Sequence, residues 1–380
     1  MAWRVPLADL DYSQAEKQAV LDVLDSRWLT MGSITQEFEA RFADQIGVKH
    51  AVAVSNATVA LHLACLALGI GPGDEVIVPS LSFVATANAV LYTGAQVRFA
   101  DILGPDELTI SPVEIEKQIT DRTKAIIVMH YGGFPCRMSE ITALAERHGL
   151  AIIEDSAHAP GASLNGVSLG VWGEAGCFSF FSNKNISTGE GGMLVTNRDD
   201  IAEKVRLMRS HGMTSLTWDR HQGHAYSYDV VELGYNYRID EIRSALGLVQ
   251  LNKLAANNAK RALITNQYWS AFQGCGLELP FSQLSTNTNI TPAYHIFPAL
   301  LPDTVDRKTF IDELRAAGIQ TSIHYPPIHL FSYYRQKYPA VRLPQTERAA
   351  ARQVTLPLYP SMKAGDIRLV IDIVIRSLGL

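Results

Sequence analysis

The sequence has few cysteines and no excess of positive charge. Its 380 residues include four cysteines and no Cys-x-x-Cys pair, so neither a disulfide framework nor a zinc ribbon is indicated. The 11 histidines form no His-Glu-x-x-His motif and no tight cluster, so we expect no catalytic metal. Lys and Arg number 33 against 38 Asp and Glu, and this mildly acidic balance argues against a protein that binds nucleic acid or a membrane surface.

Long hydrophobic runs are also absent. No stretch approaches the roughly 18 consecutive apolar residues that a membrane span needs, and residues 1–17 contain no apolar signal core. We therefore expect a cytoplasmic protein with no membrane partner. Hydrophobic residues at 47% and charged residues at 19% are typical of a globular chain with a large core. The length predicts two domains, or one large and one small domain.

Short apolar runs alternate with amphipathic segments over the first two-thirds of the chain. Such runs are typical of strands buried on both faces, and the alternation predicts a mostly parallel sheet with helices on both sides. The predicted strands are His50–Val54, Glu75–Val78, Val97–Ala100, Ala125–Met129, Ala151–Glu154, Cys177–Phe181 and Met193–Thr196. The predicted helices between them are Thr58–Leu68, Ser82–Tyr92, Ser111–Gln118 and Ser139–His148.

The remaining third of the chain has a different pattern. A long helical pattern covers residues 239–272, and strand-like runs at Ala293–Leu301 and Gln320–His324 flank a helical segment at Arg307–Ala317. We expect an α/β fold whose large domain carries a mostly parallel seven-stranded sheet, followed by a smaller α+β C-terminal domain. The expected domains are residues 1–255, with a connecting helix to about residue 272, and residues 256–380.

A lysine among small polar residues and glycines follows the predicted strand Cys177–Phe181. Open α/β sheets bind ligands at the carboxyl ends of their strands, and Lys184 lies just beyond such an end. The apolar sheet nearby can lower the pKa of its amine and make it a nucleophile, as a Schiff base with an aldehyde cofactor requires. A solvated surface lysine is the alternative that this segment alone leaves open.

An acidic residue ends an apolar run about 30 residues earlier, at Asp155. Pyridoxal-phosphate enzymes need an Asp whose carboxylate keeps the pyridine nitrogen protonated, so that the ring accepts electrons. An Asp that caps a helix would give the same pattern.

Two further segments suit the other parts of such a cofactor. The strand ending at Val54 leads into Asn56, Ala57 and Thr58, which open an Ala/Leu-rich helix whose free N–H groups would suit a phosphate. Ordinary helix capping predicts the same residues. Phe83 lies just beyond a strand and could stack on a flat ring, or simply belong to the core.

In this order and spacing, the segments resemble the DegT/DnrJ group of sugar aminotransferases, which are fold-type-I pyridoxal-phosphate enzymes. The resemblance covers almost the whole chain. Besides the segments above, it includes residues 28–32, 37–39, 233–240 (Leu-Gly-Tyr-Asn-Tyr-Arg-Ile-Asp), 322–329 (Ser-Ile-His-Tyr-Pro-Pro-Ile-His) and 356–360. It implies the fold-type-I aminotransferase fold, with pyridoxal 5'-phosphate bound to the large domain.

The resemblance also implies how the cofactor is held. Lys184 would bind it as a Schiff base and shuttle the proton, and Asp155 would pair with the pyridine nitrogen. His158 stands where the family usually has Gln, and it would face the 3-oxygen of the cofactor. Phe83 would stack on the ring. The residues around the phosphate would be Ala57, where the family usually has Gly, together with Thr58 and Ser179.

A homodimer with shared active sites follows from the same resemblance, because Asn236 would reach the phosphate of the partner subunit's cofactor. The acceptor pocket would be lined by His324, Tyr325 and His329. The small-molecule partners would be an amino-acid donor, glutamate or glutamine, and a ketosugar linked to a nucleotide.

Other activities stay open at this point. The family includes dehydratases in which His replaces the lysine, so Lys184 favours transamination. Transfer to a cyclitol ketone, or dehydration of a sugar with the same cofactor, remains an alternative, as does a catalytically silent regulatory or binding protein with this fold. The polar stretch of residues 210–228, with His211, His221 and His224, predicts a loop with surface histidines or one placed over the active site.

Overall fold

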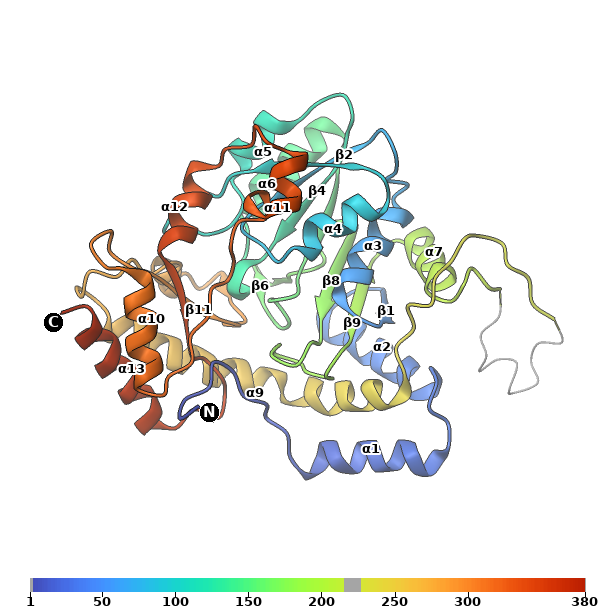
Figure 1. Ribbon diagram of the computed structural model, residues 1–380. Helices are drawn as coiled ribbons and strands as arrows, with labels where there is room; N and C mark the ends of the chain where they lie inside the picture. The colour runs from blue at the N-terminus through green and yellow to red at the C-terminus, as the bar shows by residue number, and fades with distance from the viewer. Residues whose placement is uncertain (1–2, 215–226, 380) are drawn as a thin grey trace.

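A seven-stranded sheet forms the centre of the protein in the computed structural model, which describes residues 3–214 and 227–379 (Figure 1). The strand order is β1-β9-β8-β5-β4-β2-β3. The strands are β1 His50–Val54, β2 Glu75–Pro79, β3 Gln96–Ala100, β4 Thr123–Met129, β5 Ala151–Asp155, β8 Ala175–Ser179 and β9 Gly192–Thr196. All seven overlap the predicted strands.

Most neighbouring strands in this sheet run parallel. The pairs β2–β3, β2–β4, β4–β5 and β5–β8 are parallel, and β9 is antiparallel to both β1 and β8. The predicted α/β fold with a mostly parallel sheet is therefore confirmed. The strand before Lys184 ends at Ser179, two residues earlier than predicted, because the Phe181 N–H turns back to the Ser179 hydroxyl at 3.3 Å instead of extending the strand.

Helices cover both faces of the sheet, as its apolar strands require (Figure 1). Alternate residues of each strand contribute to two separate cores. One face packs against α3 Ala57–Ala67, α4 Ala85–Tyr92 and α7 Asp199–Arg209. The other packs against α2 Ser33–Ile46, α5 Pro112–Gln118, α6 Met138–His148 and α9 Glu241–Ala271. The helix α1 Gln14–Ser26 packs along α9, and neither α1, α2 nor α7 was among the predicted helices.

The predicted long helix is present as α9, and it contributes side chains both to the core under the large sheet and to the C-terminal core (Figure 1). Its first residue, Glu241, is buried and accepts hydrogen bonds from the N–H groups of Gly32, Ile34 and Thr35 at 2.8–2.9 Å. This carboxylate caps the start of α2, where free N–H groups favour negative charge. Its last turns enter the C-terminal core through Tyr268 and neighbouring residues. Within the described ranges no helix, α9 included, has the length and apolarity to cross a bilayer.

The C-terminal part contains a small two-stranded sheet, β11 Phe297–Leu300 antiparallel to β12 Gln353–Leu356, covered by α10 Arg307–Ala316 and α13 Ala364–Ser377. The predicted strand Gln320–His324 is wrong. Within this described segment a single residue, Ser322, forms a bridge with β12, at Thr355. The pairing does not continue to His324, because the His324 N–H bonds to the Gln353 side chain and the His324 carbonyl accepts from the Tyr131 hydroxyl. The domain boundary near residue 255 stays a prediction, and α9 runs through it.

The shorter elements complete the described chain. They are η1 Tyr131–Gly133, β6 Ser163–Leu164, β7 Val167–Ser168, η2 Ser282–Thr286, β10 Ile290–Thr291, η3 Ile328–Leu330, α11 Ser332–Lys337 and α12 Pro344–Arg352. His221 and His224 of the predicted loop lie outside the described residues, whereas the His211 N–H bonds to the Tyr235 carbonyl at 2.8 Å.

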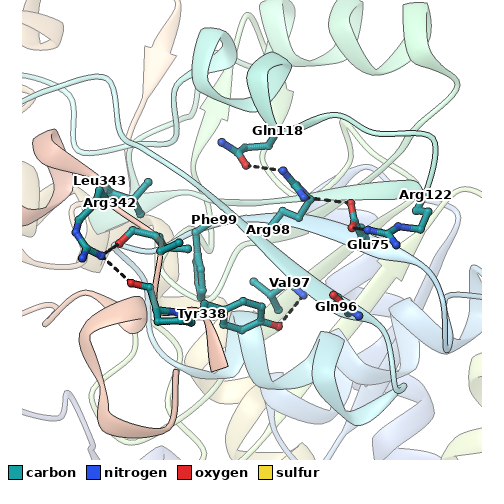
Figure 2. A pocket seen from close by; sticks show the side chains of 13 residues that line it. Glu75, Gln96, Val97, Arg98, Phe99, Gln118, Arg122, Tyr338, Arg342 and Leu343 are labelled. Carbon is teal, nitrogen blue, oxygen red and sulfur yellow. Dashed lines mark hydrogen bonds and ion pairs between the residues drawn. The ribbon is translucent and has the colours of Figure 1, made fainter. Parts of the chain in front are cut away.

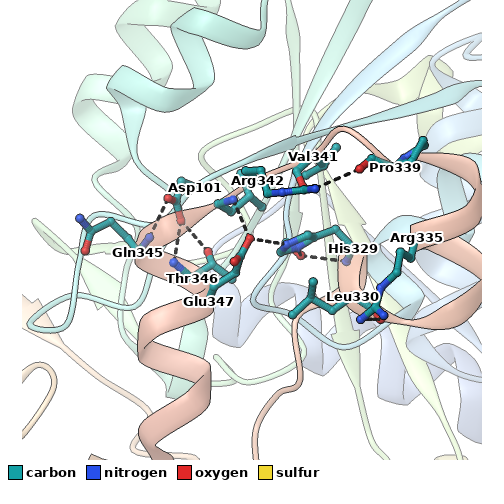
Figure 3. A network of polar contacts seen from close by, with 12 residues as sticks. Asp101, His329, Leu330, Arg335, Pro339, Val341, Arg342, Gln345, Thr346 and Glu347 are labelled. Atoms are coloured by element: carbon teal, nitrogen blue, oxygen red, sulfur yellow. Dashed lines mark hydrogen bonds and ion pairs between the residues drawn. The ribbon is translucent and has the colours of Figure 1, made fainter. Parts of the chain in front are cut away.

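Residues 328–347 fold back onto the large sheet. Asp101, just after β3, accepts hydrogen bonds from the N–H groups of Gln345 and Thr346 at 3.0 and 2.8 Å and caps α12 (Figure 3). Glu347 of α12 contacts His329 Nε2 at 3.0 Å. The C-terminal part is thereby fixed to the edge of the sheet by charge-assisted hydrogen bonds.

An open groove of about 450 Å³ lies beside this contact, lined by residues 96–99 of the edge strand β3 and by residues 338–343 (Figure 2). Glu75 pairs with two of its arginines, Arg98 and Arg122, and Arg342 donates to the carbonyls of Pro339 and Val341. Glu75 and Gln96 begin β2 and β3, and the groove runs from there along the outer edge of the sheet, whereas ligands of open α/β sheets bind at the carboxyl ends of the strands.

Replacing Asp101 tests the capping contact. Asp101→Ala removes the acceptor for the N–H groups of Gln345 and of the buried Thr346, and we expect the free energy of unfolding to fall by about 2 kcal/mol. Asp101→Asn keeps one acceptor oxygen and should cost less. Urea unfolding measures both, with the exposed Asp121→Ala as the control. Equal stability of Asp101→Ala and the control would contradict the capping role.

Candidate active site

The residues predicted to carry the chemistry lie at the carboxyl ends of β5 and β8. Asp155 is the last residue of β5 and Ser179 the last of β8. Ser179 pairs with Gly192 of β9, which pairs in turn with Val54 at the end of β1, where the chain enters α3. Because these strand ends lie along one edge of the sheet, residues far apart in sequence form one site.

Lys184 follows β8 in a tight turn, in which its N–H bonds to the Phe181 carbonyl at 2.8 Å. The side chain is partly buried. Burial lowers the pKa of its amine from 10.5 to about 8, although the negative charge of Asp155 acts in the opposite direction. A substantial fraction of the amine is therefore uncharged at neutral to mildly alkaline pH and can act as a nucleophile or base.

Asp155 is 4% exposed, and both of its carboxylate oxygens have partners. Thr86 Oγ1 donates to Oδ2 at 2.7 Å, and the Ala157 N–H donates to Oδ1 at 3.2 Å. Burial raises the pKa of Asp155, while these hydrogen bonds and the charge of Lys184 oppose the rise. A carboxylate held in this way suits a cationic partner such as a protonated ring nitrogen.

The start of α3 offers an anion site. Asn56 caps the helix through the Val59 N–H at 3.0 Å, and its carbonyl accepts from Ala60. In the described structure this leaves the N–H groups of Ala57 and Thr58 for a ligand. A Cβ on Gly192 would lie 2.5 Å from the Asn56 carbonyl carbon and 2.7 Å from the Ala57 nitrogen, so only glycine lets β9 approach this turn. These groups fit a phosphate.

His158 lies beside the lysine in a fixed, neutral form. It is 1% exposed, and burial lowers its pKa well below the ordinary value. The Gly132 N–H donates to Nδ1 at 3.2 Å, so the ring proton is on Nε2, which donates to the Tyr325 hydroxyl at 2.9 Å. The Tyr325 ring also lies 5.9 Å from that of Phe83, which is 55% exposed at the rim.

His324 is neutral for the same reason. Burial lowers its pKa to about 4, with a further contribution from the charge of Lys184. Gln353 Nε2 donates to Thr355 Oγ1 at 2.7 Å, and the Thr355 hydroxyl is also hydrogen-bonded to His324 Nδ1 at 3.0 Å. This contact holds the ring of His324 in place through Nδ1.

Two predicted residues are not joined to this cluster. Among the described residues, no hydrogen bond or ring contact links His329 or Asn236 to Lys184 or Asp155. His329 is 2% exposed, and its ring bonds to Ser80 at 2.7 Å and to Glu347, so it lies in the contact that fixes the C-terminal part (Figure 3). Asn236 lies exposed on the segment after residue 227.

The structure also adds residues that sequence reasoning missed. Thr86 orients Asp155, and its position one helical turn after Ser82, to which it bonds at 2.6 Å, is the signal that could have found it. His295 Nε2 lies 3.4 Å from the Lys184 amine. No local sequence signal indicates the contact between His295 and Lys184, because the pattern of Ala293–Leu301 predicts only a strand.

Comparison with known proteins agrees with this geometry. Residues 11–375 match the DegT/DnrJ/EryC1/StrS aminotransferase family. The chain is 40% identical to the spore coat polysaccharide biosynthesis protein SpsC of Bacillus subtilis over 367 residues, which covers 94% of this chain and 93% of that protein.

Solved structures are similar over the full length. The Helicobacter pylori aminotransferase PseC, involved in the biosynthesis of pseudoaminic acid, superposes with a TM-score of 0.91 at 30% identity and 100% coverage of both chains. A putative sugar aminotransferase from Streptococcus pneumoniae is 26% identical; its PMP form covers 99% of both chains with a TM-score of 0.92, and it has also been solved in a PLP form.

A lysine, a buried aspartate and a turn whose N–H groups fit a phosphate are the groups that pyridoxal phosphate needs, and the family match spans nearly the whole chain. This protein belongs to the DegT/DnrJ/EryC1/StrS aminotransferase family and is a pyridoxal-phosphate-dependent sugar aminotransferase.

Proposed function

We propose that this enzyme transfers an amino group from glutamate or glutamine to a ketosugar linked to a nucleotide. The observation that carries the proposal is that Lys184, Asp155 and the start of α3 come together at one edge of the sheet, where burial lowers the pKa of the Lys184 amine to about 8. The named relatives act in the biosynthesis of a spore coat polysaccharide and of pseudoaminic acid, which supports a sugar acceptor.

The residues divide the chemistry between them. When bound, pyridoxal phosphate supplies an aldehyde and an electron-accepting ring. Lys184 binds it and then carries the proton between substrate and cofactor as base and acid. Asp155 keeps the ring nitrogen protonated.

The other predicted residues hold and cover the cofactor in this proposal. The N–H groups of Ala57 and Thr58 and the Ser179 hydroxyl bind the phosphate. Phe83 covers the ring, and His158 offers its Nε2 proton to the 3-oxygen. His158 now donates that proton to Tyr325 at 2.9 Å, so binding would exchange one acceptor for the other.

The pocket proposed for the ketosugar acceptor is lined by neutral polar groups. Asn183 Oδ1 is buried without a hydrogen-bond partner among the described residues, and it lines a small cavity together with His295 and His324. An unpaired buried acceptor is costly unless a ligand donates to it. A single hydroxyl group of a sugar is such a donor, and the His324 ring offers a further polar nitrogen at this cavity. In this proposal His324 and Tyr325 line the acceptor pocket, and His329 supports it from behind.

A homodimer completes the site in this proposal. Asn236 is exposed, and its neighbours Tyr228, Val230, Val231 and Leu233 expose 56–80% of their side chains. Contiguous exposed apolar side chains mark interaction surfaces. A second copy packed here would bring Asn236 to the phosphate of its partner's cofactor.

Product analysis tests the proposed reaction. The enzyme with pyridoxal phosphate is incubated with L-glutamate or L-glutamine and a panel of uridine- and thymidine-linked ketosugars, and mass spectrometry detects the amino sugar. We expect one nucleotide-linked ketosugar to be aminated. Amination of a cyclitol ketone alone, or loss of water without amination, would contradict the proposed acceptor, and the absence of any reaction would favour a silent binding protein.

The state of Lys184 is testable in the cofactor-free protein. An amine-selective reagent attacks only uncharged amines, so we expect labelling of Lys184 to rise with pH around a midpoint near 8. The exposed Lys308 is the internal control, because its hydrogen bond to Asp312 raises its pKa above 10.5. Peptide mass spectrometry reads both sites in one sample. A common midpoint for both lysines would contradict the lowered pKa.

Mixed dimers test the shared site. Lys184→Ala should abolish turnover, and Asn236→Asp should weaken phosphate binding by charge repulsion. Random pairing of the two variants gives mixed dimers with one native site each, so we expect recovery to about a quarter of wild-type activity. Mixing Lys184→Ala with Asp155→Asn is the matched control and should recover nothing, because both residues belong to one subunit's site. No recovery in the first mixture would refute the sharing of Asn236.

A further inference from the structure

A row of buried side chains leads to the Lys184 amine. Lys184 Nζ lies 3.4 Å from His295 Nε2, His295 Nδ1 lies 2.9 Å from Asn185 Oδ1, and Asn185 Nδ2 lies 2.7 Å from Asn258 Oδ1. His295, Asn185 and Asn258 are 3%, 5% and 9% exposed. Polar groups so deeply buried are expected to be hydrogen-bonded in one defined arrangement.

Two backbone carbonyls fix the direction of each hydrogen bond in this row. A carbonyl only accepts, so Asn258 Nδ2 donates to the Pro160 carbonyl at 2.9 Å and Asn185 Nδ2 donates to the Ala293 carbonyl at 2.7 Å. The amide oxygen of each Asn therefore points away from the backbone carbonyl that its Nδ2 contacts. Asn185 Oδ1 must accept from His295, which places the ring proton of His295 on Nδ1.

The ring of His295 is neutral, so its Nε2 carries a lone pair toward Lys184. Burial lowers the pKa of His295 well below its ordinary value, and the neighbouring titratable groups lower it further; these are His158, Lys184, Arg261 and His324. With one proton, held on Nδ1, the ring has an unprotonated Nε2. The Lys184 amine must then be the donor in their contact.

The backbone holds this ring in place. The His295 N–H bonds to the Gly132 carbonyl at 2.8 Å, and Arg261 donates to the His295 carbonyl at 3.2 Å. The ring packs against His158 with centroids 4.3 Å apart. His295 therefore has little freedom to follow a moving lysine.

We propose that His295 is a positioning residue for Lys184, whose amine donates one N–H to the fixed Nε2 acceptor. With one N–H held in this way, the lone pair of the neutral amine keeps one orientation while Lys184 takes up a proton and returns it. His295 itself keeps its proton on Nδ1 throughout. This inference rests on the proposed role of Lys184 as the proton carrier.

The tautomer of His295 tests the geometry without any reaction. Nitrogen NMR of histidine side chains distinguishes protonated from unprotonated ring nitrogens. In the cofactor-free protein we expect His295 to be protonated on Nδ1 and His158 to be protonated on Nε2. The spectrum of His295→Asn identifies the His295 signals. A proton on Nε2 of His295 would overturn the proposal.

Two variants of His295 distinguish the loss of its hydrogen bond to Lys184 from the loss of packing around its ring. The amide of Gln can place an acceptor oxygen near the position of Nε2, whereas Asn reaches only the position of Nδ1. We expect His295→Asn to lower kcat of the amino-donor half-reaction about 10- to 100-fold with little change in KM, and His295→Gln to recover most of it. Thermal unfolding of both variants, with the exposed His148→Asn as control, reports any loss of packing.

Equal kcat values for the Asn and Gln variants would contradict the proposal. A wild-type enzyme that fails to transaminate would instead contradict the proposed function, and the tautomer measurement would still decide whether His295 is a fixed acceptor. The two failures are thereby distinguishable.

Discussion

Placing the Lys184 amine beside the buried Asp155 carboxylate is the constraint on which the rest of the site depends. Removing charges from water is costly, and burial alone lowers the pKa of the lysine and raises that of the aspartate. The histidines packed around them, His158, His295 and His324, have lowered pKa values and stay neutral. They add hydrogen-bonding groups to the site without adding a further charge.

Close backbone approaches build this site from distant segments. Gly133 has a φ of 86°, and a Cβ there would lie 2.7 Å from the His158 carbonyl oxygen and 2.8 Å from Ala293 Cβ. Because residue 133 has no Cβ, the turn after β4 can pack closely against the segment that carries His158 and the segment that carries His295. Gly192 does the same between β9 and the start of α3. Two glycines thus let the backbone of five segments meet near the candidate site.

Periodicity predicted most of the large domain. Apolar runs gave the strands of the sheet, and the long helical pattern gave α9, because burial on both faces dictates those residues. Periodicity does not predict the helices α1, α2 and α7. It wrongly predicts a strand at Gln320–His324, where the His324 backbone bonds to the Tyr131 hydroxyl and the Gln353 side chain. Such side-chain contacts leave no periodic signal.

The candidate site was predictable where local sequence carries the chemistry. Asp155 ends a strand, Lys184 and the start of α3 each follow one, and the structure brings them to one edge. His295 comes from 111 residues further along the chain, so its contact with Lys184 has no local signature. For His329 a local motif is present but the predicted place is not observed. The motif suggested the acceptor pocket, whereas the His329 ring bonds to Ser80 and Glu347.

The most direct test of this account is the absorption spectrum of the purified enzyme with pyridoxal phosphate, before and after addition of L-glutamate. The account predicts a yellow band from the lysine-bound cofactor that converts to the band of pyridoxamine phosphate. A lysine-bound band that ignores both glutamate and glutamine would contradict the proposed donors. A protein that stays colourless with added cofactor would contradict the central claim that Lys184 binds it.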